Sequence, residues 1–225
     1  TTGRFNGSRL LVDRVSGVTP GGGTVAGSGS VDFSGGAPTF DLNFQVANAQ
    51  LVDRDDIAAT VTGPLSIRSN GNGGRIAGNL KLERGRFTLG QAGGASGVPK
   101  LQVRHSGRDA DEVIELQQLA PWSYDLKVAG GDLRVRGLGI DSLWTTDLAI
   151  AGNIAAPRLN GRADLVRGNY EFAGRGFRLE RGIIRFRGES PPDPLLDIRA
   201  EAQVQGLDAA VLVRGSGLRP EITFS

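Results

Sequence analysis

The sequence predicts an all-β protein whose strands pair mostly in the antiparallel sense. Short segments of alternating apolar and polar residues recur along the 225 residues, and 35 glycines and 10 prolines punctuate them. A strand places alternate side chains on opposite faces, so each segment has one apolar and one polar side. Alternation alone leaves a closed sandwich, a barrel and an open groove as alternatives, because all three need one apolar face per strand.

The expected strands follow this alternation in chain order. Phenylalanine, leucine and valine occupy every second position of residues 40–46, and leucine, valine, tyrosine or isoleucine do so in the next five segments. Those five segments are residues 80–82, 101–103, 124–128, 133–135 and 148–150. Glycine-rich residues 21–23, 70–74 and 91–97 are expected to be turns or loops.

The alternation is clearest toward the C-terminus. In residues 196–205 every even position is apolar and every odd position is polar, and residues 177–180 and 184–187 alternate in the same way. Val211 with Val213, and Ile222 with Phe224, complete the pattern. The chain therefore predicts about a dozen strands of ordinary length or somewhat longer. Residues 111–119 are the only helix candidate, because Val113, Ile114, Leu116 and Leu119 tolerate a 3.6-residue period.

A sequence pattern that occurs twice in the chain predicts repeated meanders. Residues 78–89 align with residues 161–172, with the same spacing from the first glycine to an Arg-Gly pair and an aromatic residue two positions later. We expect one continuous domain over residues 1–225, with repeat-like meanders at about 1–120 and 121–225.

Residues that carry enzyme chemistry are scarce. The chain has one histidine, His105, and no cysteine, so a catalytic triad or a thiolate metal site lacks its parts. The acidic clusters at residues 53–56 and 109–115 lack the spacing of a calcium loop and are interpreted as solvated. Gly137-Leu-Gly139 and Gly215-Ser-Gly217 are interpreted as turns. We predict no enzyme, catalytic residue, cofactor or metal.

The charge pattern argues against nucleic acid as a partner. The chain has 26 basic and 24 acidic side chains, and its aromatic residues are too scattered to stack bases. Eight arginines stand against three acids between Arg158 and Arg187, an excess that we interpret as a soluble strand face, with anionic lipid headgroups as the alternative. The chain has no membrane-spanning apolar run, signal peptide or methionine, and we expect it to be a fragment of a larger protein.

An ordered run of residues in the second half resembles the C-terminal domain of the TamB family, the inner-membrane subunit of the bacterial translocation and assembly module. The resemblance is close over residues 124–225 and generic before them. The run comprises Val135, Gly137, Gly139, Asp141, Leu143, Trp144, Asp147, Leu148, Gly152, Pro157, Leu159, Gly161, Arg167, Gly168, Tyr170, Phe172, Gly174, Phe177, Leu179, Gly182, Ile184, Phe186, Pro194 and Asp197.

The resemblance implies a long sheet curled into an open, taco-like groove with an apolar lumen, similar to AsmA-like and bridge-like lipid carriers. It implies phospholipid transport to the outer membrane, support of autotransporter assembly, and a periplasmic place in a Gram-negative bacterium. The parent protein would have an N-terminal inner-membrane helix and would meet the outer-membrane barrel protein TamA through a C-terminal segment, and neither part is expected in this fragment.

The groove hypothesis assigns a lining that would hold phospholipid or detergent acyl chains. The expected lining residues are Phe177, Leu179, Ile184, Phe186, Leu196, Ile198, Ala200, Ala202, Val204, Val211, Val213, Ile222 and Phe224. One alternative is a chaperone or scaffold that pairs its edge near residues 211–224 with strands of a client barrel or autotransporter. Another is a secreted sandwich or adhesin-like passenger with a closed core. An exposed groove or edge also predicts self-association.

Overall fold

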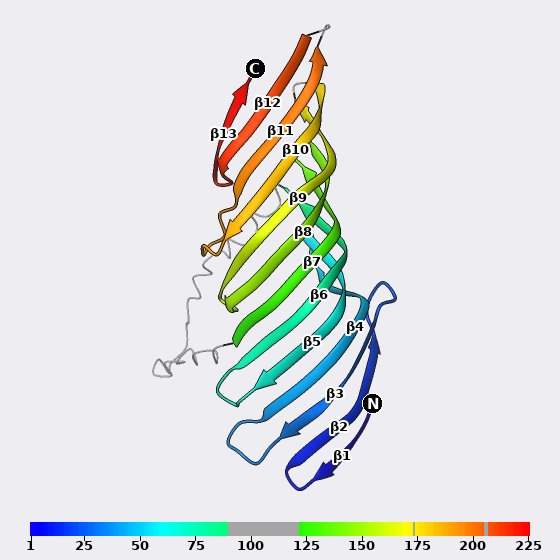
Figure 1. The fold of residues 1–225 in the computed structure, drawn as a ribbon. Helices are drawn as coiled ribbons and strands as arrows, with labels where there is room; N and C mark the ends of the chain where they lie inside the picture. Colours follow the sequence, from blue (N-terminus) through cyan, green and yellow to red (C-terminus); the bar gives the residue numbers. More distant parts are fainter. Residues whose placement is uncertain (90–121, 173, 205–206) are drawn as a thin grey trace, which may run out of the picture.

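A computed structural model describes residues 1–89, 122–172, 174–204 and 207–225 of the chain. Over these residues the chain forms 13 strands in a single sheet, and the strands lie side by side in sequence order (Figure 1). The expected strand at 101–103, the turn at 91–97, the helix candidate at 111–119 and His105 lie outside the described residues. The all-β prediction is confirmed.

The first six strands are β1 (Thr2–Asn6), β2 (Arg9–Val18), β3 (Thr24–Asp32), β4 (Thr39–Asp53), β5 (Ile57–Ser69) and β6 (Gly74–Thr88). The other seven are β7 (Trp122–Gly137), β8 (Ile140–Asn153), β9 (Ala156–Phe172), β10 (Arg175–Arg187), β11 (Leu195–Val204), β12 (Leu207–Ser216) and β13 (Arg219–Phe224). Turns separate β2 from β3 at residues 19–23 and β5 from β6 at residues 70–73, where glycines predict them.

One prediction about the strands is wrong. Residues 124–128 and 133–135 form the single strand β7 and not two strands. The pairing of β7 with β8 shifts register between Gly130 and Leu133, and Asp132 has a φ of 61°. This bulge inserts one extra residue into a continuous strand and shifts the alternation of its side chains by one position. The sequence pattern therefore looks interrupted where the strand continues.

Two antiparallel meanders make up the sheet. Strands β1 to β6 pair antiparallel, as do strands β7 to β13, and β6 pairs with β7 in parallel. The echoed segments, residues 78–89 and 161–172, lie on β6 and β9, which run in the same direction along the sheet. Gly78 and Gly161 both lie opposite large apolar residues of both neighbouring strands.

The sheet is open and curled. Strands β1 and β13 are its two ends and do not pair with each other, so the sheet is not closed into a barrel. Among the described strands, the extensive contacts join only sheet neighbours, and no second layer covers either face. Val46 and Ala49 are nevertheless fully buried, so the sheet must cover its own apolar face by curling around it. Figure 1 shows the long central strands bending as they cross the molecule.

Contacts between aromatic rings on distant strands also show that the sheet is curled. The rings of Phe40 on β4 and Trp122 on β7 have centroids 6.0 Å apart, as do those of Phe172 on β9 and Phe224 on β13. Neighbouring strands lie about 4.8 Å apart, so strands four places apart in a flat sheet are separated by roughly 19 Å. The Phe172–Phe224 contact therefore requires the C-terminal strands to turn back toward β9.

Candidate functional site

One face of the sheet is apolar from β3 to β13. Cross-strand register places an apolar side chain of one strand beside an apolar side chain or glycine of the next. The directly opposed pairs include Val25–Val46, Leu42–Ile67, Ile67–Ile76, Ile76–Tyr124, Leu126–Ile150, Ile150–Leu159, Ile184–Leu196, Ile198–Val213 and Val213–Ile222. Adjacent strand residues point to opposite faces, so the intervening polar residues form the other face. We call these two surfaces the apolar face and the polar face.

The expected lining residues all occur on strands β10 to β13, and those whose side chains are described lie on the apolar face. Phe177, Leu179, Ala200 and Val211 are buried together in one cluster. The partly buried Ile198, Ala202 and Val213 pack against this cluster, and Ile184, Phe186 and Leu196 are half-buried. Val204 ends β11, but its side chain is outside what the structure describes.

Two of the expected residues are much more exposed than the others. Ile222 and Phe224, on the edge strand β13, are 54% and 59% exposed. They lie opposite Val213 and Val211 of β12, so they continue the apolar face beyond the buried cluster. The apolar face therefore reaches the end of the sheet, where no further strand of the described chain covers it.

Sequence reasoning assigned no lining residues to the first half of the chain, where the structure forms an equivalent cluster. Val46, Ala49, Val61, Leu80 and Leu82 are buried there. Val25, Ala59, Leu65, Leu126, Val128 and Leu133 pack around them. The alternation in residues 40–46 was visible in the sequence, but the register shift between Val46 and Ala49 moves the second of these residues out of phase. An uninterrupted pattern would have continued to Asn48 and placed Ala49 on the polar face, so it is the bulge that brings Ala49 to the apolar face.

Trp144 occupies the middle of the apolar face with its polar atom satisfied. Its side chain is 3% exposed, and the indole Nε1–H donates to Ser142 Oγ at 2.8 Å. The hydroxyl of Thr146, two residues further along β8, donates to the carbonyl of Gly130 at 3.2 Å. These buried polar groups are paired locally, so they interrupt the apolar face without leaving a free donor or acceptor to bind a polar ligand.

Glycines allow the strands to approach closely where the sheet bends. Gly63 and Gly161 have φ values of 145° and 118°, which L side chains rarely adopt. A Cβ on Gly161 would lie 2.1 Å from the carbonyl oxygen of Asp147, and one on Gly63 would lie 2.3 Å from that of Asn79. The obstructing atoms are backbone atoms of the neighbouring strand, so no side-chain movement relieves the overlap.

The polar face carries ion pairs between adjacent strands. Asp141 accepts from Arg134 at 2.9 Å and lies 3.3 Å from Arg136, and Asp197 lies 3.0 Å from Arg181. The hydrogen bond from Arg134 holds the pKa of Asp141 below its ordinary value, and the same contact raises the pKa of Arg134. These groups are solvent-exposed, so they add little stability and mainly keep this face soluble.

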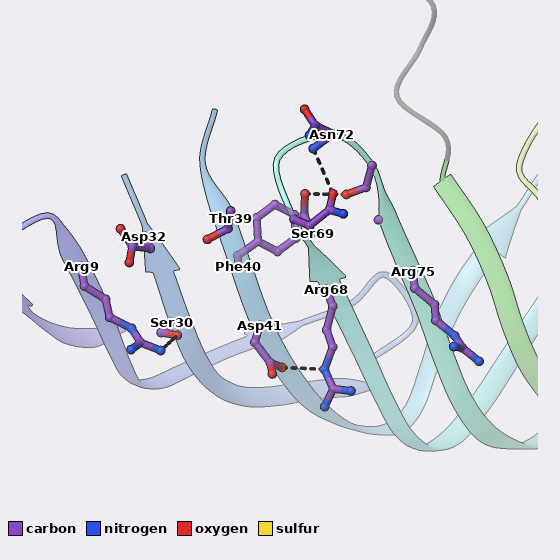
Figure 2. Close-up of a pocket in the computed structure, with 13 residues that line it drawn as sticks. Arg9, Ser30, Asp32, Thr39, Phe40, Asp41, Arg68, Ser69, Asn72 and Arg75 are labelled. Carbon is purple, nitrogen blue, oxygen red and sulfur yellow. Dashed lines mark hydrogen bonds and ion pairs between the residues drawn. The ribbon is translucent and has the colours of Figure 1, made fainter. Parts of the chain in front are cut away.

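A hollow at one end of strands β2 to β6 is lined by polar residues of this face. It encloses about 750 Å³. Figure 2 shows Arg9 reaching Ser30 and Arg68 reaching Asp41, with donor–acceptor distances of 2.9 and 3.1 Å. Phe40 is the one aromatic side chain in its lining. Because the arginines here bind their own chain, we assign this hollow no ligand.

The described residues bring together no metal-ligating set. Among them, no group of three or more histidine, cysteine, aspartate or glutamate side chains is placed to hold a metal ion. In the described part of the chain, no helix has the length and apolar character to cross a membrane. The chemistry that the arrangement offers is the shelter of apolar groups along a curled face.

The family model described as the TamB C-terminal domain matches residues 13–225. The match includes the first half of the chain, where the sequence resemblance was only generic. No curated protein matches the chain.

Proposed function

Because this chain belongs to the TamB family, we propose that its apolar face is a path for phospholipid acyl chains between the inner and outer membranes of a Gram-negative bacterium. The observation that carries this proposal is the continuity of the apolar face across the strands of an open, curled sheet. A closed, filled core would offer no such path, and the strands that the structure describes form neither a closed sandwich nor a barrel.

The physical demand on such a path is large and needs no catalysis. Leaving a sixteen-carbon acyl chain in water costs on the order of 10 kcal/mol, at about 0.8 kcal/mol per CH₂ group. A curled face lined by leucine, isoleucine and phenylalanine offsets most of that cost. Half-buried side chains such as Leu148 and Ile150 leave apolar surface for an occupant.

In this proposal the chain acts within a larger protein of the translocation and assembly module. The parent protein is anchored in the inner membrane by an N-terminal helix, crosses the periplasm, and meets a TamA-like outer-membrane barrel protein through its C-terminus. These parts of the proposal rest on the family and not on a site described here.

A photo-crosslinker on β8 tests the lipid path with a matched control. In the full-length protein in cells, a crosslinker at Leu148 or Ile150 on the apolar face should capture phospholipid. The same group at Ala149, which lies between them and points to the polar face, should capture much less. Equal capture at all three positions, or none at Leu148 and Ile150, would contradict the path.

The edge strand β13 supports a second candidate function, a scaffold for outer-membrane barrel or autotransporter strands. All six residues of β13 are exposed, and the strand pairs only with β12. Ala210 and Ser225 exchange two backbone hydrogen bonds, of 2.7 and 3.0 Å. Because paired residues alternate in an antiparallel ladder, the N–H groups of Ile222 and Phe224 face the open edge. A client strand, or a second copy of the chain, would bind there by β-augmentation.

This geometry corrects the expected position of the edge and of its test. Val211 and Val213 lie on β12, which pairs on both sides, so proline at either position would break an internal ladder. Ile222→Pro removes only an edge-facing N–H, and Ile222→Thr retains it. If scaffolding is the function, Ile222→Pro lowers client assembly in cells, whereas Ile222→Thr and lipid capture at Ile150 are unaffected. Normal assembly with Ile222→Pro would contradict the scaffold.

A further inference from the structure

Five arginines surround a second hollow on the polar face, where β6 and β7 run parallel. The hollow encloses about 550 Å³, and Asp132 is the only acidic residue in its lining. The arginines are Arg84 and Arg86 of β6, Arg134 and Arg136 of β7, and Arg167 of β9. They come from distant parts of the sequence, and the parallel pairing of β6 with β7 brings the first four together.

The centre of this group is a pair of like charges in direct register. Arg86 lies opposite Arg134 across the parallel pair, an arrangement that destabilises a sheet. The next residues in the same row are Ala58 on β5 and Leu143 on β8, and neither carries a charge. Leu143 in turn lies opposite Arg167 of β9. No acid therefore lies directly opposite either arginine, and Asp53 enters the row only beyond Ala58.

Nearby acids balance the five arginines only in part. Asp141 contacts both Arg134 and Arg136, and Asp53 lies 3.9 Å from Arg86. With Asp132, three acids stand near five guanidinium groups, which leaves an excess of two positive charges. The side chains of Arg86, Arg134 and Arg136 are about half exposed, at 53%, 51% and 52%, so a ligand from solution can reach them.

Another like-charge pair on the same face shows how the sheet neutralises such a contact by itself. Arg68 and Arg75 are also in direct register, between β5 and β6. In their row, Asp41 lies opposite Arg68 and Asp125 lies opposite Arg75. Both arginines are ion-paired with these neighbours, Arg68 to Asp41 at 3.1 Å. This row places an acid directly beside each arginine, whereas the acid in the row through Arg86 and Arg134 is Asp53, which is separated from Arg86 by one strand and lies 3.9 Å from it.

From this contrast we infer that the arginine hollow binds the phosphate group of an anionic ester. The planar guanidinium group matches phosphate oxygens with two parallel hydrogen bonds. A phosphate monoester carries about −1.5 to −2 charges at neutral pH and a phosphodiester headgroup carries about −1, so either is attracted by an excess of two positive charges. The phosphate could belong to a soluble ester or to a lipid headgroup. The site lies on the polar face and does not depend on the proposed acyl path.

A double substitution with a matched control tests this site in the purified chain. Arg86→Gln with Arg134→Gln removes the central pair of the arginine hollow, and Arg68→Gln with Arg75→Gln removes the same charge from the row in which each arginine has its own acid. The probes are glycerol 3-phosphate, followed by calorimetry, and vesicles of phosphatidylglycerol or of phosphatidylcholine alone, followed by sedimentation. The first variant should weaken phosphate-dependent binding at least tenfold, because charge-assisted hydrogen bonds are lost. The control should weaken it less than twofold.

The outcomes separate the two sources of phosphate. Selective loss of phosphatidylglycerol binding alone supports the site with a lipid headgroup as its ligand, and selective loss of glycerol 3-phosphate binding supports it with a soluble ester. Equal losses in the two variants would show nonspecific charge attraction and overturn the inference. Failure of the unsubstituted chain to bind any phosphate probe would also overturn it. A urea midpoint for each variant close to that of the unsubstituted chain confirms that the fold is retained.

Discussion

Replacing Gly161 with alanine should destabilise the sheet at the bend of β9. The φ of Gly161 is 118°, and the added Cβ would lie 2.1 Å from the carbonyl oxygen of Asp147 and 3.1 Å from the Cα of Leu148. A left-handed backbone costs an L-residue roughly 1–2 kcal/mol. Forcing a methyl group against a packed neighbour costs typically about 1–3 kcal/mol more. We therefore expect a loss of about 2–5 kcal/mol in the free energy of unfolding.

Gly131→Ala is the matched control for this substitution. Gly131 lies within β7, has no heavy atom within 4 Å of a built Cβ, and is not among the glycines with positive φ. Alanine there should be neutral or should stabilise the chain by about 0.4–1 kcal/mol, because it restricts the unfolded state. The comparison therefore isolates the bend from the general effect of removing a glycine.

Thermal and urea unfolding followed by circular dichroism measure both variants. For a chain of this size each kcal/mol shifts Tm by roughly 2–4 °C, so Gly161→Ala should melt roughly 4–20 °C lower than the unsubstituted chain. A lower urea midpoint with an unchanged slope would indicate lost stability of the same folded state. If Gly161→Ala melts at the same temperature as Gly131→Ala, the close approach of β9 to β8 does not constrain the fold and the reasoning fails.

Three further predictions concern the two faces. Ile198→Arg should abolish lipid transport in cells, whereas Leu212→Arg, on the polar face of the next strand, should preserve it. Equal transport by the two variants would contradict the assignment of the faces. Because the folded pKa of Asp141 lies below the ordinary value of 3.8, the contribution of its contact with Arg134 is present above that pH and is lost as the pH falls through the lower folded value. Carboxyl NMR should give a midpoint below 3.8 that rises in Arg134→Gln, and an unchanged midpoint would refute the contact. Trp144→Ala should cost about 3–5 kcal/mol in urea unfolding, and a loss below 1 kcal/mol would contradict its place in a packed interior.

A strand could be predicted from the sequence when its alternation of apolar and polar residues runs without interruption. Strand β11 pairs with β12 without a register shift, so the apolar positions from Leu196 to Ala202 could be read directly. In β4 and β7, the bulges at Asn48 and Asp132 change the phase within one strand, which hid Ala49 and divided β7 into two predicted strands. Bulges of this kind depend on the bend of the whole sheet, which no short window of sequence encodes.

The open form of the sheet and the arginine hollow depend on pairings between strands distant in sequence. Alternation gives every strand an apolar side, but it does not determine whether β1 meets β13. The resemblance to a family supplied that expectation, and the order of the strands confirms it. The excess of arginine between Arg158 and Arg187 was visible in the sequence. Its neighbours on other strands were not, and only Arg167 of that run lines the hollow.

The parallel pairing of β6 with β7, which we call the seam, should form late when the chain folds. Each antiparallel pair joins strands that follow one another in sequence, so each can form as a hairpin soon after its residues leave the ribosome. The seam instead joins Gly74 to Trp122, 48 positions later. Long-range pairing must overcome more loop-closure entropy, and it forms late. We expect the two meanders to nucleate separately and to join last along this seam, with the unpaired flank of β6 as the place where misassembly begins.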